Sequence, residues 1–203
     1  MLPEPIKNLI DRLSQLPGMG QRSATRLAFH LLNQPAQKVL ELAQAIKDLP
    51  EKTKVCQNCF NLTGEAGKCL ICSNEKRQPN IICAVEDVLD IIPIERTRQF
   101  NGVYHILGGL ISPAEGMTPD KLRVRELAER IKKLKNQFPA LNQIEIILAF
   151  NPTTEGDTTA LYLEKILSPL SIKITKLNRG LSTGSDLEYA DETTLVNALK
   201  FRH

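Results

Sequence analysis

The stretch LSQLPGMGQRSATRLAFHLL, residues 13–32, places two helix-like patterns on either side of a Pro-Gly-Met-Gly turn. The two glycines let backbone N–H groups approach a ligand closely, because no Cβ intervenes. The helix expected after the turn points its free amides and its positive dipole end toward the same place. Two arginines, four residues apart on one face of that helix, add positive charge. These groups predict a clamp that binds phosphate and reads no base.

The residues of this predicted clamp are Gly18, Gly20, Arg22 and Arg26. An ordinary helical hairpin with a glycine turn is the alternative interpretation. The core of the turn, LPGMG at residues 16–20, resembles the helix-hairpin-helix family, and that resemblance favours the DNA-binding interpretation.

Apolar residues recur at helical spacing before, within and after this stretch, which predicts a helical module over residues 1–54. Each set should form the packing face of one helix. The first set is Ile6, Leu9, Ile10, Leu13 and Leu16, the second is Ala24, Leu27, Ala28 and Leu31, and the third is Val39, Leu42, Ala43, Ile46 and Leu49.

Four of the five cysteines lie in the segment CQNCFNLTGEAGKCLIC, with the spacing C-x2-C-x9-C-x2-C. A gap of two residues lets both sulfurs of a pair turn toward one point, and two such pairs complete a tetrahedral site. A closed four-thiolate site leaves no open coordination position, so we predict one structural Zn²⁺ per chain in a module of residues 55–78. Two disulfides or a chance spacing are the alternatives, which a reducing compartment disfavours. The predicted ligands are Cys56, Cys59, Cys69 and Cys72.

Composition places the chain among globular proteins, with 42% hydrophobic and 24% charged residues over 203 positions. The formal charge of +3 is too small to establish a nucleic-acid partner by itself. The N-terminal residues contain neither a signal segment nor a membrane span, and the longest apolar runs are short. We therefore expect a cytoplasmic protein with no membrane association, in which the thiols stay reduced.

After Pro79, short apolar runs alternate with helical patterns, which predicts a parallel sheet covered on both faces. This α/β domain should span residues 79–177, with its best helix at about residues 119–136. Cys83, in the middle of one apolar run, should be an inert core thiol. His30 and His105 lie in apolar segments, and no Cys-His or Ser-His-Asp arrangement can be argued from them. The strand-like runs are NIICAV, VYHIL, IEIILAF and IKITKL.

Two segments of this domain resemble the Toprim domains of topoisomerases and primases. ICAVED places Glu86 at the end of a strand, and LAFNPTTEGDTTALYL resembles the second Toprim acidic motif, Asp-Pro-Asp-Arg-Glu-Gly-Glu in type IA topoisomerases. On that pattern the two metal-binding aspartates are replaced by Asn151 and Thr153, and the arginine by Thr154. Mg²⁺ sites depend on carboxylates, so this loss should remove two-metal catalysis.

The acidic residues that remain at this degenerate site are Glu86, Glu155 and Asp157. We expect them to approach one another, which would allow weak Mg²⁺ binding that relieves their repulsion. No turnover of a DNA substrate is expected to depend on them.

The helix-hairpin-helix turn, the four-cysteine site and the degenerate Toprim domain, in this order, resemble the RecR family of bacterial recombination mediators. YHILGGLISPAEGM from Tyr104 and RGLSTGSDLEYADETTL from Arg179 extend the resemblance, the latter in a C-terminal segment of residues 178–203. The resemblance implies a non-enzymatic DNA-repair protein that forms a ring-like homo-oligomer, a tetramer, around DNA. It also implies action with the RecO and RecF proteins to load recombinase onto gapped DNA.

The sequence therefore predicts a chain of mixed class, α in its first part and α/β in its second. Two other functions stay open at this point. A metal-dependent Toprim nuclease or primase would use the remaining carboxylates, and a protein-interaction scaffold would have no contact with DNA. ATP hydrolysis is not expected, because the glycine-containing segments lack the spacing and lysine of a phosphate-binding loop.

Overall fold

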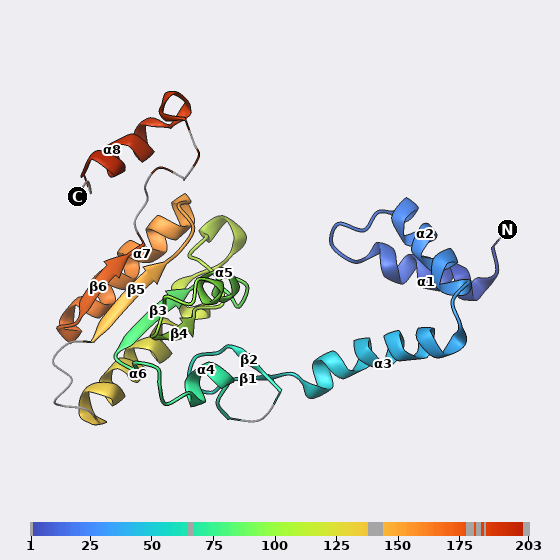
Figure 1. The fold of residues 1–203 in the computed structure, drawn as a ribbon, viewed down its shortest axis with the longest axis horizontal. Coiled ribbons are helices and arrows are strands. Elements are labelled where there is room, and N and C mark those ends of the chain that lie inside the picture. The colour runs from blue at the N-terminus through green and yellow to red at the C-terminus, as the bar shows by residue number, and fades with distance from the viewer. Residues whose placement is uncertain are drawn as a thin grey trace. The chain divides into compact units, whose positions relative to one another are not determined.

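The computed structural model of the chain describes residues 2–64, 67–137, 144–177, 181, 184 and 186–200. It divides into two compact units, residues 1–53 and 54–203 (Figure 1). Arg179, where the expected C-terminal motif begins, lies outside the described residues. No helix among the described residues is both long enough and apolar enough to cross a membrane.

The first unit is helical, as its apolar periodicity predicts. Its helices are α1 (Glu4–Ser14), α2 (Gln21–Leu32) and α3 (Ala36–Lys52). Helices α1 and α2 pack through Ile10, Ala24 and Ala28, where the two alanines let the helix backbones come close. Leu27 does not complete this face as predicted, since it is 39% exposed.

Helix α3 differs from the prediction more strongly. None of its residues is buried, and Leu42, Ile46 and Leu49 are exposed. The helix itself is confirmed, but within the described residues no element of the first unit covers its apolar stripe. The periodicity therefore identified a helix with an apolar face and not the partner of that face.

The second unit begins with the cysteine module, residues 54–78, and continues with a four-stranded parallel sheet. The module contains the antiparallel pair β1 (Lys54–Val55) and β2 (Leu62–Thr63) and the short helix α4 (Leu70–Ser73). The sheet has the strand order β4-β3-β5-β6. Its strands are β3 (Ile81–Val85), β4 (Val103–Ile106), β5 (Glu145–Ala149) and β6 (Lys173–Lys176), one in each predicted apolar run.

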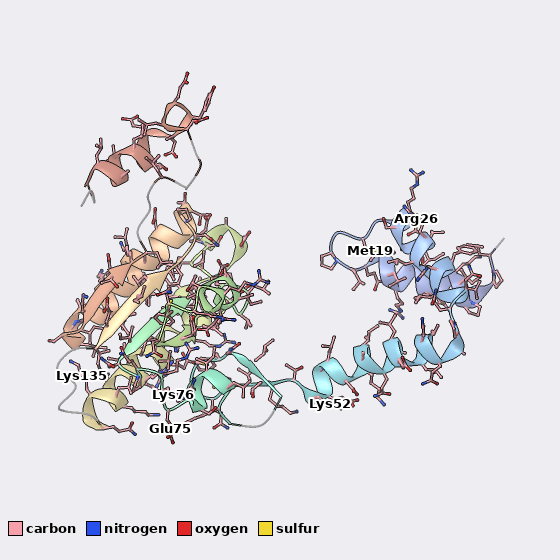
Figure 2. All side chains as sticks on the ribbon, in the orientation of Figure 1. Met19, Arg26, Lys52, Glu75, Lys76 and Lys135 are labelled. Carbon is pink, nitrogen blue, oxygen red and sulfur yellow. The ribbon has the colours of Figure 1, made fainter. Side chains whose placement is uncertain are left out.

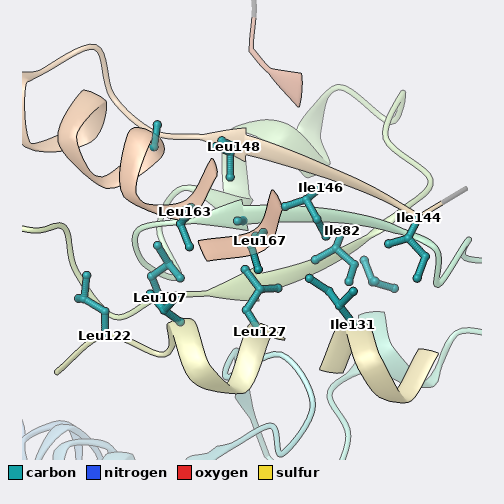
Figure 3. Packing of buried hydrophobic residues seen from close by; sticks show 14 of the residues in the cluster. Ile82, Leu107, Leu122, Leu127, Ile131, Ile144, Ile146, Leu148, Leu163 and Leu167 are labelled. Carbon is teal, nitrogen blue, oxygen red and sulfur yellow. The ribbon is translucent and has the colours of Figure 1, made fainter. Parts of the chain in front are cut away.

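The sheet register places alternate side chains of the central strands on opposite faces. Ile82 of β3 pairs with Val103 of β4 and with Ile146 of β5. One face packs against α6 (Val124–Gln137) and α7 (Thr154–Leu167), as Figure 3 shows for Leu127, Ile131, Leu163 and Leu167. The opposite face packs against α5 (Ile91–Arg96) and against residues of the cysteine module. Both faces are covered, as predicted.

The long helix of this domain begins later than predicted. Pro119–Lys121 forms a separate 3₁₀ turn, and Leu122 is extended and buried in the core. Helix α6 therefore starts at Val124. Leu127 and Ile131 on its predicted face are fully buried. The remaining described elements are 3₁₀ turns at Pro113–Glu115, Ser168–Leu170 and Leu187–Tyr189, and helix α8 at Glu192–Lys200.

Candidate functional site

The turn between α1 and α2 has the conformation that a close ligand approach requires. Gly18 adopts φ +75°, a left-handed conformation that favours glycine, and the amide of Met19 donates to the Leu16 carbonyl at 3.0 Å. Gly20 precedes α2 in an extended conformation. A side chain added at Gly20 would meet no atom of the described residues within 4 Å. Packing within the described unit therefore does not explain this second glycine.

The start of α2 is suited to an anion. Among the described residues no side chain caps its first amides, and its first turn contains no acidic residue. The structure places Arg22 and Arg26 on this helix, both exposed, and Figure 2 shows Arg26 projecting from it. Free amides and the positive dipole end thus begin a helix that also carries two exposed guanidinium groups. Met19, which the sequence did not single out, holds the turn by packing against the buried cluster of α1 and α2.

The four predicted metal ligands converge. The sulfurs of Cys56, Cys59, Cys69 and Cys72 lie within 4.8 Å of one another, and none is in a disulfide. The sulfurs of Cys59 and Cys69 are 3.5 Å apart. A metal bound tetrahedrally with metal–sulfur bonds of about 2.3 Å holds its sulfurs about 3.8 Å apart. The donor set and its spacing therefore fit a metal such as zinc, and the two-disulfide alternative is not observed.

Hydrogen bonds and nearby charge prepare these sulfurs for a cation. The amide of Cys69 donates to the sulfur of Cys56 at 3.3 Å, and the side chain of Asn58 donates to the sulfur of Cys72 at 3.6 Å. The pKa of Cys72 is lowered to about 5, first by the hydrogen bond from Cys59 and further by the charge of Arg130. A bound divalent cation would remove the repulsion between adjacent thiolates.

The cysteine module docks onto the edge strand β4 through contacts that the sequence did not reveal. The carbonyl of Cys59 accepts a hydrogen bond from the amide of Ile106 at 2.9 Å. Phe60, at φ +67°, packs edge-to-face on His105 at 5.4 Å between ring centroids. The guanidinium of Arg123 lies 4.8 Å from the centre of the Phe60 ring. A non-glycine residue in this backbone conformation is held there by its surroundings.

The Toprim-like segments lie at the carboxyl ends of neighbouring strands, where open α/β sheets bind ligands. Glu86 directly follows β3, and Thr153 begins α7 after β5. The hydroxyl of Thr153 accepts a hydrogen bond from the Gly156 amide at 3.1 Å. Thr153, at a position where the Toprim motif has a metal-binding aspartate, thus caps a helix.

Glu86, Glu155 and Asp157 do not form a three-ligand metal group in the described part of the structure. Among the described residues, the cysteine cluster is the only group of three or more histidine, cysteine or carboxylate side chains placed to hold a metal. The pKa of Glu86 is raised by burial and then by Asp90 and Asp87, which lie in the loop after its own strand. Glu155 and Asp157 are exposed in the first turn of α7, where the helix dipole stabilises negative charge.

The remaining predictions concern single residues. Cys83 is buried, and burial raises its pKa to about 12, which confirms an inert core thiol. His105 is fully buried in β4, and its Nε2 lies 2.8 Å from the carbonyl oxygen of Arg123. His30 is exposed on α2.

Known protein families and individual proteins match nearly the whole chain in sequence. Sequence models match for the RecR helix-hairpin-helix over residues 6–49, the Toprim domain over residues 80–178 and the RecR C-terminal region over residues 180–203. The recombination protein RecR of Myxococcus xanthus is 44% identical over 202 residues, covering 100% of this chain and 98% of that protein. The RecR protein of Moorella thermoacetica is 47% identical, covering 99% of this chain and 97% of that protein. The RecR protein of Gloeobacter violaceus is 46% identical, covering 100% of this chain and 98% of that protein.

Proposed function

Since this chain belongs to the RecR family, we propose that it is a non-enzymatic, DNA-binding recombination mediator that acts in DNA repair. The observation that carries this proposal is the glycine turn before α2, a helix whose first amides have no side-chain cap and which carries the exposed Arg22 and Arg26. Backbone amides and guanidinium groups are the donors that match phosphate oxygens. Binding should depend on the DNA backbone and not on base sequence.

The DNA-binding proposal is tested by measuring affinity for gapped DNA at several salt concentrations. The double variant Arg22→Ala/Arg26→Ala should bind more weakly, and its log–log salt slope should be smaller by roughly 0.7–0.9 for each lost phosphate contact. The matched control is Lys38→Ala/Lys47→Ala, which removes two exposed charges from α3 in the same unit. A folded Arg22/Arg26 variant with unchanged affinity and slope would make the turn an ordinary hairpin.

The family resemblance further supports a cytoplasmic role in which the protein acts with RecO and RecF to load recombinase onto gapped DNA. The three curated relatives described above are each named a recombination protein. A loading assay with RecO, RecF, recombinase and gapped DNA, run with and without this protein, tests the role. Equal loading in both reactions would reject it.

We also propose that the protein is a homo-oligomer, a tetrameric ring. The first unit supports this, because large apolar side chains of α1, α2 and α3 are exposed on it, and contiguous exposed apolar surface commonly marks a protein–protein contact. A groove of about 510 Å³ lies between the helices of this unit, and α3 buries none of its apolar side chains. Leu9, Leu32 and Leu40 are exposed along the groove. A second copy of the chain would cover these residues, and a light-scattering mass at the tetramer value tests the proposal.

The cysteine cluster is proposed to hold one structural Zn²⁺ per chain, through Cys56, Cys59, Cys69 and Cys72. Such a metal supplies folding energy and, with four thiolates, has no open position for catalysis. Cys59→Ser should yield protein without zinc by atomic absorption and with a lower melting temperature. Cys83→Ala, which removes the cysteine outside the cluster, should keep its zinc. Metal-free wild-type protein that melts at the same temperature as the zinc-containing protein would refute the site.

A metal-dependent nuclease or primase is the competing function. Asn151 and Thr153 stand where the Toprim motif has metal-binding aspartates, which favours a site without catalysis and with weak Mg²⁺ binding at most. Mg²⁺-dependent cleavage or primer synthesis that disappears in Glu86→Ala would replace the mediator proposal with this one.

A further inference from the structure

Arg130 is a buried charge without an ordinary partner. It lies on α6 with 8% of its surface exposed, and its Nη1 donates to the Tyr104 carbonyl of β4 at 2.6 Å. Among the described residues it forms no ion pair with a carboxylate, although Glu126 and Glu129 line the same cleft. Guanidinium groups stay charged in proteins, and buried charges are costly unless they are compensated.

Residues of the cysteine module line the same cleft as Arg130, alongside other charged residues of α6. A cleft of about 570 Å³ separates α6 from the module, and Arg130 lines it together with Asn58 and Cys72. Burial lowers the pKa of Arg130, while the charges of the four cysteines, Cys72 foremost, raise it. Arg130 and Cys72 thus line one cleft, and the sign of their interaction is attractive.

With a metal bound, the cysteine cluster would carry a negative charge that a nearby arginine can compensate. Four thiolates and one Zn²⁺ carry a net charge of about −2. Three of the four cysteines are buried, so solvent screens this charge poorly. Arg130 contributes a permanent positive charge to the cleft that Cys72 also lines, and its hydrogen bond to the Tyr104 carbonyl fixes this charge on β4.

We propose that Arg130 is the counter-ion of the metal-bound cysteine cluster and positions the cysteine module against β4. The guanidinium compensates part of the negative charge, and its hydrogen bond to the Tyr104 carbonyl anchors that charge to the sheet. The inference rests on the proposed zinc site and concerns metal retention, not DNA contact. Groups around a metal site that orient or compensate its ligands commonly change metal affinity by about 10–100-fold when they are removed.

Zinc release to an excess of a chromogenic chelator tests the inference at constant pH. Arg130→Met removes the charge, and Arg130→Gln removes it while keeping an N–H donor for the Tyr104 carbonyl. Both should release zinc about tenfold faster than the wild type. Arg130→Lys should fall between them and the wild type. The control Arg125→Met, on the same helix with a side chain 89% exposed, should release zinc at the wild-type rate.

The possible outcomes distinguish a failure of the zinc proposal from a failure of this inference alone. Wild-type protein with no zinc by atomic absorption refutes the metal site, and the inference with it. Wild-type protein with one zinc, and a folded Arg130→Met or Arg130→Gln with unchanged release, overturns the inference alone. If neither neutral variant folds, Arg130→Lys decides, because a folded, zinc-containing lysine variant supports a charge requirement and a metal-free one contradicts it.

Discussion

Glu95 of α5 is held by two partners, Arg77 at the end of the cysteine module and Tyr104 of strand β4. Arg77 donates from Nη1 to Oε1 of Glu95 at 2.9 Å, and the Tyr104 hydroxyl donates to the same oxygen at 2.6 Å. Arg77 also donates to the carbonyls of Phe100 and Gly102. The pKa of Glu95 is lowered, first by the hydrogen bond from Arg77. The charged carboxylate is therefore the form that the fold stabilises.

Replacing Glu95 by Gln should lower the free energy of unfolding by about 2 kcal/mol at pH 7, because it removes the charge from this pair. The folded-state pKa of Glu95 lies below its ordinary value of 4.5. The stabilisation is thus fully present above pH 4.5 and is lost as the pH falls through the lowered folded-state value. Urea unfolding at several pH values, with zinc content followed, checks both the cost and its pH dependence.

Glu129→Gln is the control for this network, because its partner Arg125 is exposed and surface pairs contribute little. It should change the free energy of unfolding by less than about 0.5 kcal/mol. An equal cost for Glu95→Gln and Glu129→Gln, or a Glu95 effect that does not depend on pH, would contradict the prediction.

Single residues differ in how far the sequence predicts them. The cysteine ligands are predictable because a two-residue gap fixes the distance within each pair. Arg130 is not, because a lone arginine beside the apolar stripe of an amphipathic helix is usually exposed. Its burial depends on the cysteine module, which is more than fifty residues away in the sequence. The acidic residues were expected from the Toprim resemblance, and the structure places Glu155 and Asp157 in the first turn of α7.

At the scale of elements, the turn from β5 into α7 depends on one glycine. A Cβ on Gly156 would lie 2.1 Å from the carbonyl oxygen of Asn151, which is backbone and cannot move aside locally. The Gly156 amide also donates to the capping hydroxyl of Thr153. The glycine of the degenerate acidic motif is therefore required by the fold, whether or not the segment binds a metal.

Gly156→Ala should consequently lower the free energy of unfolding by about 1–3 kcal/mol or prevent folding. Gly20→Ala is the matched comparison, because Gly20 has no neighbour within 4 Å and a φ of −78° that alanine adopts freely. It should leave stability nearly unchanged while weakening DNA binding, since a methyl group there would meet the phosphate. Chemical unfolding and a DNA-binding titration on both variants separate the two roles, and a destabilised Gly20→Ala would contradict this account.

The sequence predicts the positions of the strands of the covered sheet and of the helices with a strong apolar periodicity. All four strands of the sheet lie in the expected apolar runs, because central parallel strands are apolar throughout. The start of α6 was placed too early, because Pro119 and Asp120 resemble a helix start while Leu122 is drawn into the core. Element boundaries of this kind depend on tertiary packing, which a helical period does not encode.

At the scale of the whole molecule, the first unit exposes an apolar face that none of its own helices covers in the described structure. Its helices α1 and α2 bury only a small cluster, and α3 contributes none of its residues to a core. The sequence indicated an apolar face on α3, and the structure shows that no element of the first unit covers this face within the described residues. The homo-oligomer that the family resemblance implies would supply the cover that this face lacks within its own unit.

Leu40→Glu, in the groove of the first unit, should lower the mass of the assembly in solution, because a carboxylate would be buried at the contact between copies. Leu70→Glu is the control, because Leu70 is 90% exposed on α4 and lies outside the groove. Light scattering and circular dichroism on the same samples distinguish dissociation from unfolding. A folded Leu40→Glu protein of unchanged mass would show that the groove is not a contact between copies.

The two edges of the sheet are protected in different ways. Strand β6 carries Lys173 and Lys176 at its ends, and charged residues on an edge oppose pairing with another sheet. Strand β4 is fully buried, its Ile106 amide donates to the carbonyl of Cys59, and its Tyr104 carbonyl accepts from Arg130. The cysteine module is thus the cover of an aggregation-prone edge. If the proposed metal holds the module in place, its removal should expose this edge and favour intermolecular β-structure.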